Sequence, residues 1–150
     1  VVCPYCVKLY EQRWYMLAVS DYIKKPRTYA LDRLLDVKTT DEQYQLPKDF
    51  DAETYFRSVI GVSGMEDIPE KVRIKVYDYQ VQYIRTLPIH ASQKELETAD
   101  GYSIFEYYLI PNYEFRLELR QHLSAIEILE PEYLRDEMRE EAKKLLKMYE

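Results

Sequence analysis

Arginine and tyrosine alternate in one apolar segment, at Arg27, Tyr29 and Arg33. In an extended strand, residues an even number of positions apart point to the same side, so these three side chains would share one face. A guanidinium group binds phosphate through two parallel hydrogen bonds, and an aromatic ring between two such groups can stack on a base. The spacing therefore indicates binding of a flat anion. An equally good interpretation has the arginines in ion pairs with the nearby aspartates, which are Asp21, Asp32 and Asp36.

The preceding apolar segment, residues 13–19, reads Arg-Trp-Tyr-Met-Leu-Ala-Val and is typical of a strand. Trp14 and Tyr15 would then point to opposite faces, one toward the core and one toward solvent. We expect Trp14 to pack in the core, because tryptophans are highly buried on average.

Composition places the chain among ordinary globular proteins, with 47% hydrophobic and 32% charged residues in 150. The net charge is −6, which argues against a protein that coats nucleic acid nonspecifically. Charge is uneven, however: seven basic and four acidic residues give residues 1–38 a charge of +3. No apolar run is long enough to cross a membrane, and no signal peptide is visible. Since the chain begins at Val1 without Met, we interpret it as a fragment of a longer protein.

Cys3-Pro4-Tyr5-Cys6 matches the redox motif of glutaredoxins in its letters. In that motif a strand comes first and a helix follows, which lowers the pKa of the first thiol. Here the residues that follow, 7–10, alternate like a strand, so we expect free thiols in a reducing cytosol and no redox role. His90 and His122 are too isolated to complete a zinc site. With no nucleophile–base pair and no glycine-rich phosphate loop either, no enzyme, cofactor or metal is predicted.

The periodicity predicts the remaining elements. Glu11-Gln12 forms a turn, a loop runs from Ser20 to Pro26, and a long strand covers residues 29–39. A short helix over residues 51–61 begins at the cap Asp51, and a domain boundary falls within residues 61–69. The second half then follows the order β-α-β-β-α-β-α. Its elements are a strand at 71–77, a helix at 79–87, a hairpin at 90–110 across Asp100-Gly101, a helix at 112–122 capped by Asn112, a strand at 125–129 and a helix at 131–149.

The N-terminal motifs resemble the WYL domain of bacterial transcription regulators. The resemblance rests on Pro4-Tyr5, on residues 13–18 and on residues 27–34, where Met16 replaces the family's usual Leu and Leu34 its usual Ile. Residues 125–135 resemble the end of the WCX extension that often follows a WYL domain. Together the two resemblances span essentially the whole chain.

The resemblance implies an α+β fold in two domains. Residues 1–65 would form a small Sm- or SH3-like β-barrel lacking its first strand, plus a short helix. Residues 66–150 would form a ferredoxin-like βαββαβ domain with a C-terminal helix.

The resemblance also implies a function: the C-terminal effector-sensing and oligomerisation region of a cytoplasmic, DNA-binding regulator, whose helix-turn-helix domain would lie upstream. An anionic ligand, either a nucleotide or single-stranded DNA, would bind the barrel. The alternative is a dimerisation scaffold without a ligand, in which Arg33 is a structural ion-pair partner. A homodimer is expected, and no membrane association. The residues carried over to the ligand site are Arg13, Tyr15, Arg27, Tyr29 and Arg33.

Overall fold

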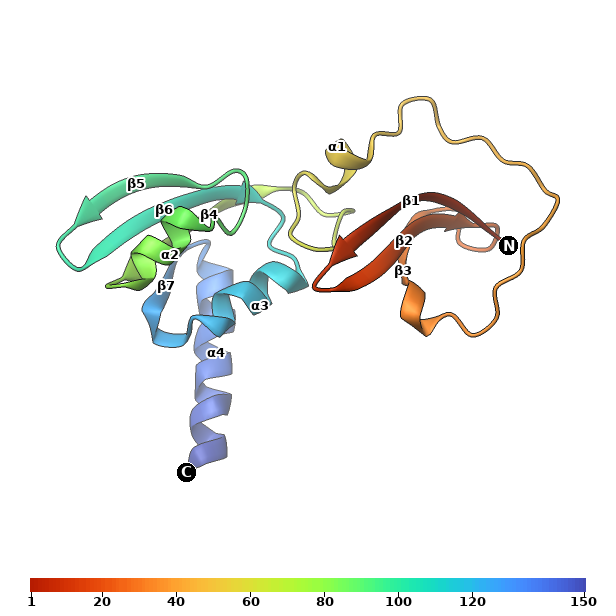
Figure 1. The fold of residues 1–150 in the computed structure, drawn as a ribbon. Coiled ribbons are helices and arrows are strands. Elements are labelled where there is room, and N and C mark those ends of the chain that lie inside the picture. Colours follow the sequence, from red (N-terminus) through yellow and green to blue (C-terminus); the bar gives the residue numbers. More distant parts are fainter.

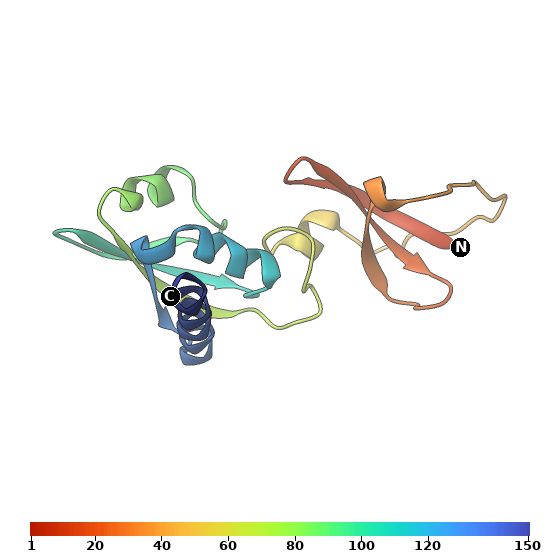
Figure 2. The same cartoon turned by 90° about the horizontal axis from the view of Figure 1, so that it is seen from below.

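The computed structural model describes residues 1–150, which form two lobes, each built on its own antiparallel sheet (Figure 1). Seen from below, the lobes lie side by side, with the short helix α1 and its flanking loops between them (Figure 2). None of the helices combines the length and the apolar composition that crossing a membrane requires.

The N-terminal lobe holds a three-stranded sheet in the order β1-β2-β3. A two-residue turn at Glu11 and Gln12 joins β1 to β2, as predicted, and both residues have positive φ, 45° and 64°. Such turns twist in the same sense as the strands that they join. The elements of this lobe are β1 (Val2–Tyr10), β2 (Arg13–Ser20), β3 (Pro26–Ala30), the 3-10 helix η1 (Leu31–Arg33) and α1 (Ala52–Phe56).

Two predictions for this lobe were wrong. The sheet is open and does not close into a barrel, because β1 and β3 each pair only with β2. The strand predicted over residues 29–39 ends at Ala30, where the chain turns into η1. Beyond η1 the apolar residues have no neighbouring strand to pack on, and Leu35 and Val37 are exposed. Alternation alone could not reveal that missing neighbour.

The C-terminal lobe has the predicted order β-α-β-β-α-β-α, and its sheet runs β5-β6-β4-β7. Asn112 caps α3 by accepting a hydrogen bond from the Phe115 amide at 2.9 Å, and Asp51 caps α1 in the same way through the Thr54 amide. Gly101 supplies the positive φ, 81°, of the β5–β6 turn. The elements are β4 (Glu70–Tyr77), α2 (Gln80–Thr86), β5 (Lys94–Ala99), β6 (Tyr102–Leu109), α3 (Tyr113–Gln121), β7 (Ile126–Glu130) and α4 (Glu132–Tyr149).

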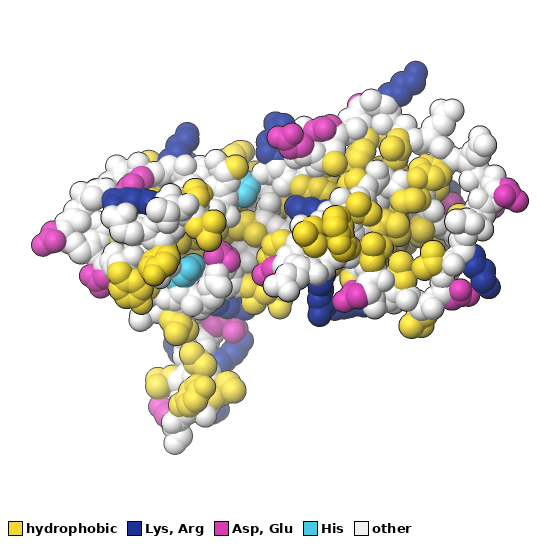
Figure 3. Space-filling view, viewed as in Figure 1, with side chains coloured by type: hydrophobic (Ala, Val, Ile, Leu, Met, Phe, Trp, Pro, Cys, Tyr) yellow, Lys and Arg dark blue, Asp and Glu magenta, His cyan; other side chains and the backbone are white.

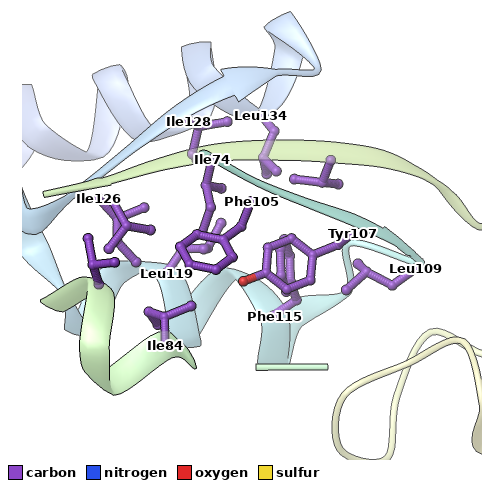
Figure 4. Close-up of a cluster of buried hydrophobic side chains, with 13 residues drawn as sticks. Ile74, Ile84, Phe105, Tyr107, Leu109, Phe115, Leu119, Ile126, Ile128 and Leu134 are labelled. Atoms are coloured by element: carbon purple, nitrogen blue, oxygen red, sulfur yellow. The ribbon is translucent and has the colours of Figure 1, made fainter. Parts of the chain in front are cut away.

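One cluster of buried side chains holds the C-terminal lobe together (Figure 4). Alternate residues of β4 and β6 meet α2, α3 and the start of α4 in this cluster. The Tyr107 and Phe115 rings pack edge to face with centroids 6.0 Å apart, and the Tyr107 hydroxyl donates to Gln93 at 2.9 Å. Burial raises the pKa of Tyr107, so this hydroxyl stays protonated. The cluster gives the sheet one covered face, which is the rigid base for the rest of the molecule.

Candidate functional site

The register of the first sheet assigns its side chains to two faces. Directly opposed residues of antiparallel strands share a face. Met16 lies opposite both Val7 and Tyr29, Leu9 lies opposite Trp14, and Ala18 lies opposite Arg27. One face, which we call the open face, is therefore formed by Val7, Leu9, Trp14, Met16, Ala18, Arg27 and Tyr29. Ala18 is buried and Met16 and Tyr29 are half-buried, whereas the other four are exposed.

The open face exposes large apolar side chains and one cation. Val7, Leu9 and Trp14 have 57%, 54% and 51% of their surface in solvent, and Arg27 is exposed. Hydrophobic side chains also gather over this lobe in the space-filling view (Figure 3). The prediction that Trp14 enters the core was wrong, because nothing covers the end of this face at which Trp14 and Leu9 lie. Arg27 lies opposite Ala18, four residues along β2 from Trp14, so the indole and the guanidinium group on one face suit stacking and ion pairing with a nucleic acid that spans both.

The opposite side, the covered face, packs against the loops that lead to the second lobe. Lys8 donates to the Gly61 carbonyl at 2.6 Å, with its ammonium group 4.2 Å from the Phe56 ring centroid. Thr28 donates to the Val62 carbonyl at 2.9 Å. Burial lowers the pKa of Lys8, and the nearby Glu114 partly opposes this shift. This face therefore serves contact between the lobes.

The five predicted ligand residues do not converge on one surface. Arg27 and Tyr29 share the open face, whereas Tyr15 lies opposite Lys8 and belongs to the covered face. Arg13 forms an ion pair with Asp32 at 3.5 Å, with both side chains about half exposed. Arg33 is exposed in η1, outside the strand that was expected to align it with Arg27. Of the three residues predicted to share one face of a strand, only Arg27 and Tyr29 therefore do so.

The linker between the lobes is hydrogen-bonded from both sides. On the second lobe, the buried Glu114 accepts from the Val62 amide at 3.2 Å and from the Ser63 hydroxyl. Asn112 donates to the carbonyls of Ile60 at 2.6 Å and Ser63 at 2.9 Å. Since Lys8 and Thr28 bind the same segment from the first sheet, we call residues 60–63 the clamped linker. Through this segment the first sheet is connected to the start of α3.

His90 adds a second contact near α1. Its Nε2 lies 2.9 Å from the Arg57 carbonyl, which can only accept, so Nε2 carries a proton. Its Nδ1 accepts from the Ser92 amide at 3.1 Å, which requires the neutral ring. Burial lowers the pKa of His90 accordingly. Together with Lys8 and Arg57, His90 lines a cavity of about 480 Å³.

A smaller cavity of about 270 Å³ lies beside the clamped linker, where its strongest polar groups are already paired. Arg116 forms an ion pair with Glu137 at 2.7 Å, and the Tyr133 hydroxyl donates to Glu70. The hydrogen bond between Arg116 and Glu137 raises the pKa of Arg116 and lowers that of Glu137. Because Arg116 and Glu70 already have partners, this cavity is a poorer ligand site than the open face.

Cys3 and Cys6 are both free and half-buried in β1. The strand, not a helix, continues after Cys6, as the alternation of residues 7–10 predicted. Burial raises the pKa of the Cys6 thiol, the opposite of what a reactive thiolate needs. The geometry therefore favours structural thiols.

Sequence reasoning missed the open-face residues Leu9 and Trp14. The turn at Glu11-Gln12 was a usable signal, because a two-residue turn places Leu9 opposite Trp14 on one face. Whether that face is covered is not encoded in the alternation. The hydrogen bonds of the clamped linker could not be predicted from the sequence, since Glu114 and Val62 are 52 residues apart in the chain.

Comparison with known proteins gives two family matches. The WYL domain model matches residues 1–39, and the WCX domain model matches residues 68–146. No curated protein matches the chain.

Among solved structures, proteasome accessory factor B/C (PafBC) of Arthrobacter aurescens is similar to 90% of this chain, with 14% identity and a TM-score of 0.37. The chain spans 20% of the length of that protein. A similarity of this size adds nothing to the argument from the residues. The family matches confirm the resemblance seen in the motifs: the chain belongs to the WCX domain family and carries a WYL domain ahead of its WCX domain.

Proposed function

We propose that this chain is the effector-sensing and oligomerisation region of a cytoplasmic bacterial transcription regulator, and that it has no enzymatic activity. The ligand is an anion with flat rings, either a nucleotide or a short single-stranded oligonucleotide. The observation that carries the proposal is the open face, where Arg27 and Tyr29 share one side of the sheet with the exposed Trp14 in a lobe matched by the WYL model. DNA binding by the whole regulator would come from a separate helix-turn-helix domain.

On the open face, Trp14 and Tyr29 stack on bases and Arg27 binds a phosphate. Arg33, exposed in η1 next to β3, supplies a second phosphate contact. Tyr15 and Arg13 act indirectly, Tyr15 from the covered face and Arg13 through Asp32.

The proposal includes a fold assignment for each lobe. The order β5-β6-β4-β7, with β6 between the two strands joined by α2, supports a ferredoxin-like assignment for the second lobe. The sharply turned three-stranded meander supports an Sm-like assignment for the first. We place the domain boundary at residues 65 and 66, just after the clamped linker.

Fluorescence polarisation with a short labelled single-stranded DNA tests the ligand proposal. Binding should weaken with salt, and Arg27→Ala should reduce the salt slope by about 0.7, the value for one phosphate contact on a single strand. Trp14→Ala should cost about 1–3 kcal/mol of binding free energy. Lys94→Ala is the matched control, because it removes one positive charge from the exposed strand β5 of the other lobe. Equal losses in Lys94→Ala and Arg27→Ala would contradict the site, as would equal affinity for duplex DNA.

A scaffold without a ligand is the second candidate, and the Arg13–Asp32 ion pair favours it. In that case the basic side chains of the first lobe stabilise its fold and bind no ligand. Arg33→Ala would then lower the melting temperature and leave every binding isotherm unchanged. Arg33 itself has no carboxylate within ion-pair distance, so we rank the scaffold second.

A further inference from the structure

The cavity of about 480 Å³ near His90 has the size of a small-molecule site, and such sites are frequent where two domains meet. Three segments form its walls: the edge strand β1, the helix α1 with the residues that follow it, and the loop between α2 and β5. The helix α1 lies between the lobes (Figure 2). The cavity shares only Val7 with the open face, so it is a separate surface.

Two cations line this cavity without a carboxylate partner. Neither the Lys8 ammonium nor the Arg57 guanidinium group has a carboxylate oxygen within ion-pair distance. Lys8 uses one of its three N–H donors on the Gly61 carbonyl, and the Arg57 side chain donates only to the Thr54 hydroxyl, at 3.0 Å. The donors that remain can form charge-assisted hydrogen bonds to an anion in the cavity.

The rest of the wall is mostly apolar. Val59 is buried, and the Phe56 ring lies against Lys8, with its centroid 4.2 Å from the ammonium group. The His90 ring is neutral and both of its nitrogen atoms have partners within the chain, so it adds ring surface and no charge. A ligand that fills this cavity therefore needs an apolar body as well as an anionic group.

The charge of the cavity limits the charge of its ligand. Glu53, exposed on the first turn of α1, is the one carboxylate in the lining. Two cations and one carboxylate leave a single positive charge, which matches a monoanion and not a phosphate dianion. Burial lowers the pKa of Lys8, and an anion beside it would offset the cost of keeping this ammonium group charged.

We propose that this cavity binds a small organic acid that has one carboxylate group and an apolar body. The carboxylate accepts hydrogen bonds from Arg57 and Lys8, and the body lies against Phe56 and Val59. This site goes beyond the nucleic-acid surface proposed for the open face and does not depend on it. Because both lobes supply its walls, a bound acid contacts the two lobes at once.

Three naphthalene compounds test the charge selectivity of the site. The probe is 1-naphthoate, and the matching amide and phosphate keep its ring while changing its charge. Isothermal titration calorimetry on the 150-residue chain should show saturable binding of naphthoate and weaker binding of both other compounds. No saturable binding of naphthoate would overturn the site. Equal binding of the amide would overturn the role of the cations, and tighter binding of the phosphate would overturn the match to a monoanion.

Charge variants locate the binding. Arg57→Gln should weaken naphthoate binding about tenfold, because a hydrogen bond to a charged group is lost, and Glu53→Gln should strengthen it. Arg139→Gln is the matched control, since it removes one positive charge from α4 in the other lobe. Equal losses in the two arginine variants, with helices intact by circular dichroism, would overturn the proposal. Loss of binding in Trp14→Ala would place naphthoate on the open face, which overturns this site and leaves the nucleic-acid proposal standing.

The two cysteines provide a test within the cavity itself. Cys6 lines the cavity and Cys3 does not, and the chain has no others. Cys3→Ser therefore leaves a single thiol at the cavity, whereas Cys6→Ser leaves a single thiol outside it. Saturating naphthoate should slow alkylation by iodoacetamide in the Cys3→Ser protein and leave the rate unchanged in the Cys6→Ser protein. Equal protection of both thiols, or protection of neither, would overturn the placement of the acid in this cavity.

Discussion

The sheets of the two lobes both have apolar strands, but they differ in how many of their apolar side chains are buried. Of the buried hydrophobic residues, only Leu17, Ala18, Val59 and Val62 precede residue 66, and all the others belong to the second lobe. The second sheet meets helices on one face and builds a core there. The first sheet carries equally apolar residues, yet its open face meets solvent. The difference shows that a strand's composition does not decide its role, because burial needs a second layer.

The largest effect should come from emptying the core of the second lobe. Phe115 is fully buried, so Phe115→Ala should lower the free energy of unfolding by about 3–5 kcal/mol through lost burial and a cavity. Urea denaturation followed by circular dichroism measures this loss. Trp14→Ala is the matched change on the open face, and we expect it to cost less than about 1 kcal/mol of stability. Similar losses in the two variants would show that the first sheet has a core of its own.

An intermediate effect should come from the clamped linker that joins the lobes. Gly61 has a φ of 70°, and a Cβ there would lie 2.6 Å from Glu114 Cγ. Gly61→Ala should therefore cost about 1–3 kcal/mol by backbone strain and by displacing the Glu114 side chain. Proteolysis of the linker, relative to that of the wild type, reports the release of the lobes. If protection of residues 60–63 is unchanged, the coupling assigned to Glu114 is wrong.

The smallest effect should be a pH dependence specific to the second lobe. Hydrogen bonding from Arg85 lowers the pKa of Glu95 to about 2, from an ordinary value of 4.5. The folded state then binds fewer protons than the unfolded state, so this stabilisation is complete above about pH 4.5 and is lost as pH falls toward 2.

Urea midpoints between pH 6 and pH 3 test this window. Glu95→Gln should flatten the dependence, while Glu42→Gln, in the exposed loop of the first lobe, should leave it unchanged. The lowered pKa of His90 also makes the protein less stable as the pH falls, but in a higher pH range than Glu95. The reason is that the neutral ring is the form that hydrogen-bonds to Arg57 and Ser92. A steeper fall in Glu95→Gln than in the wild type would contradict the assignment.

Local signals in the sequence determined much of the second lobe. Asn112 caps α3 and Gly101 forms the β5–β6 turn, because each depends on its own short-range hydrogen bonds or dihedral angles. The order of strands and helices from β4 to α4 follows from hydrophobic periodicity, which is also local. The turn at Glu11-Gln12 and the strand nature of the Cys3–Cys6 segment were predictable for the same reason.

Only the tertiary structure decided which faces are covered. Trp14 is exposed because nothing covers its end of the first sheet, and the strand at Tyr29 ends early because nothing pairs with its continuation. The separation of Tyr15 from Tyr29 follows from the register of β2 and β3. The clamped linker joins Lys8, Gly61 and Glu114, residues far apart in the chain. A sequence encodes local conformational preference directly, but contacts between distant segments depend on how every layer packs at once.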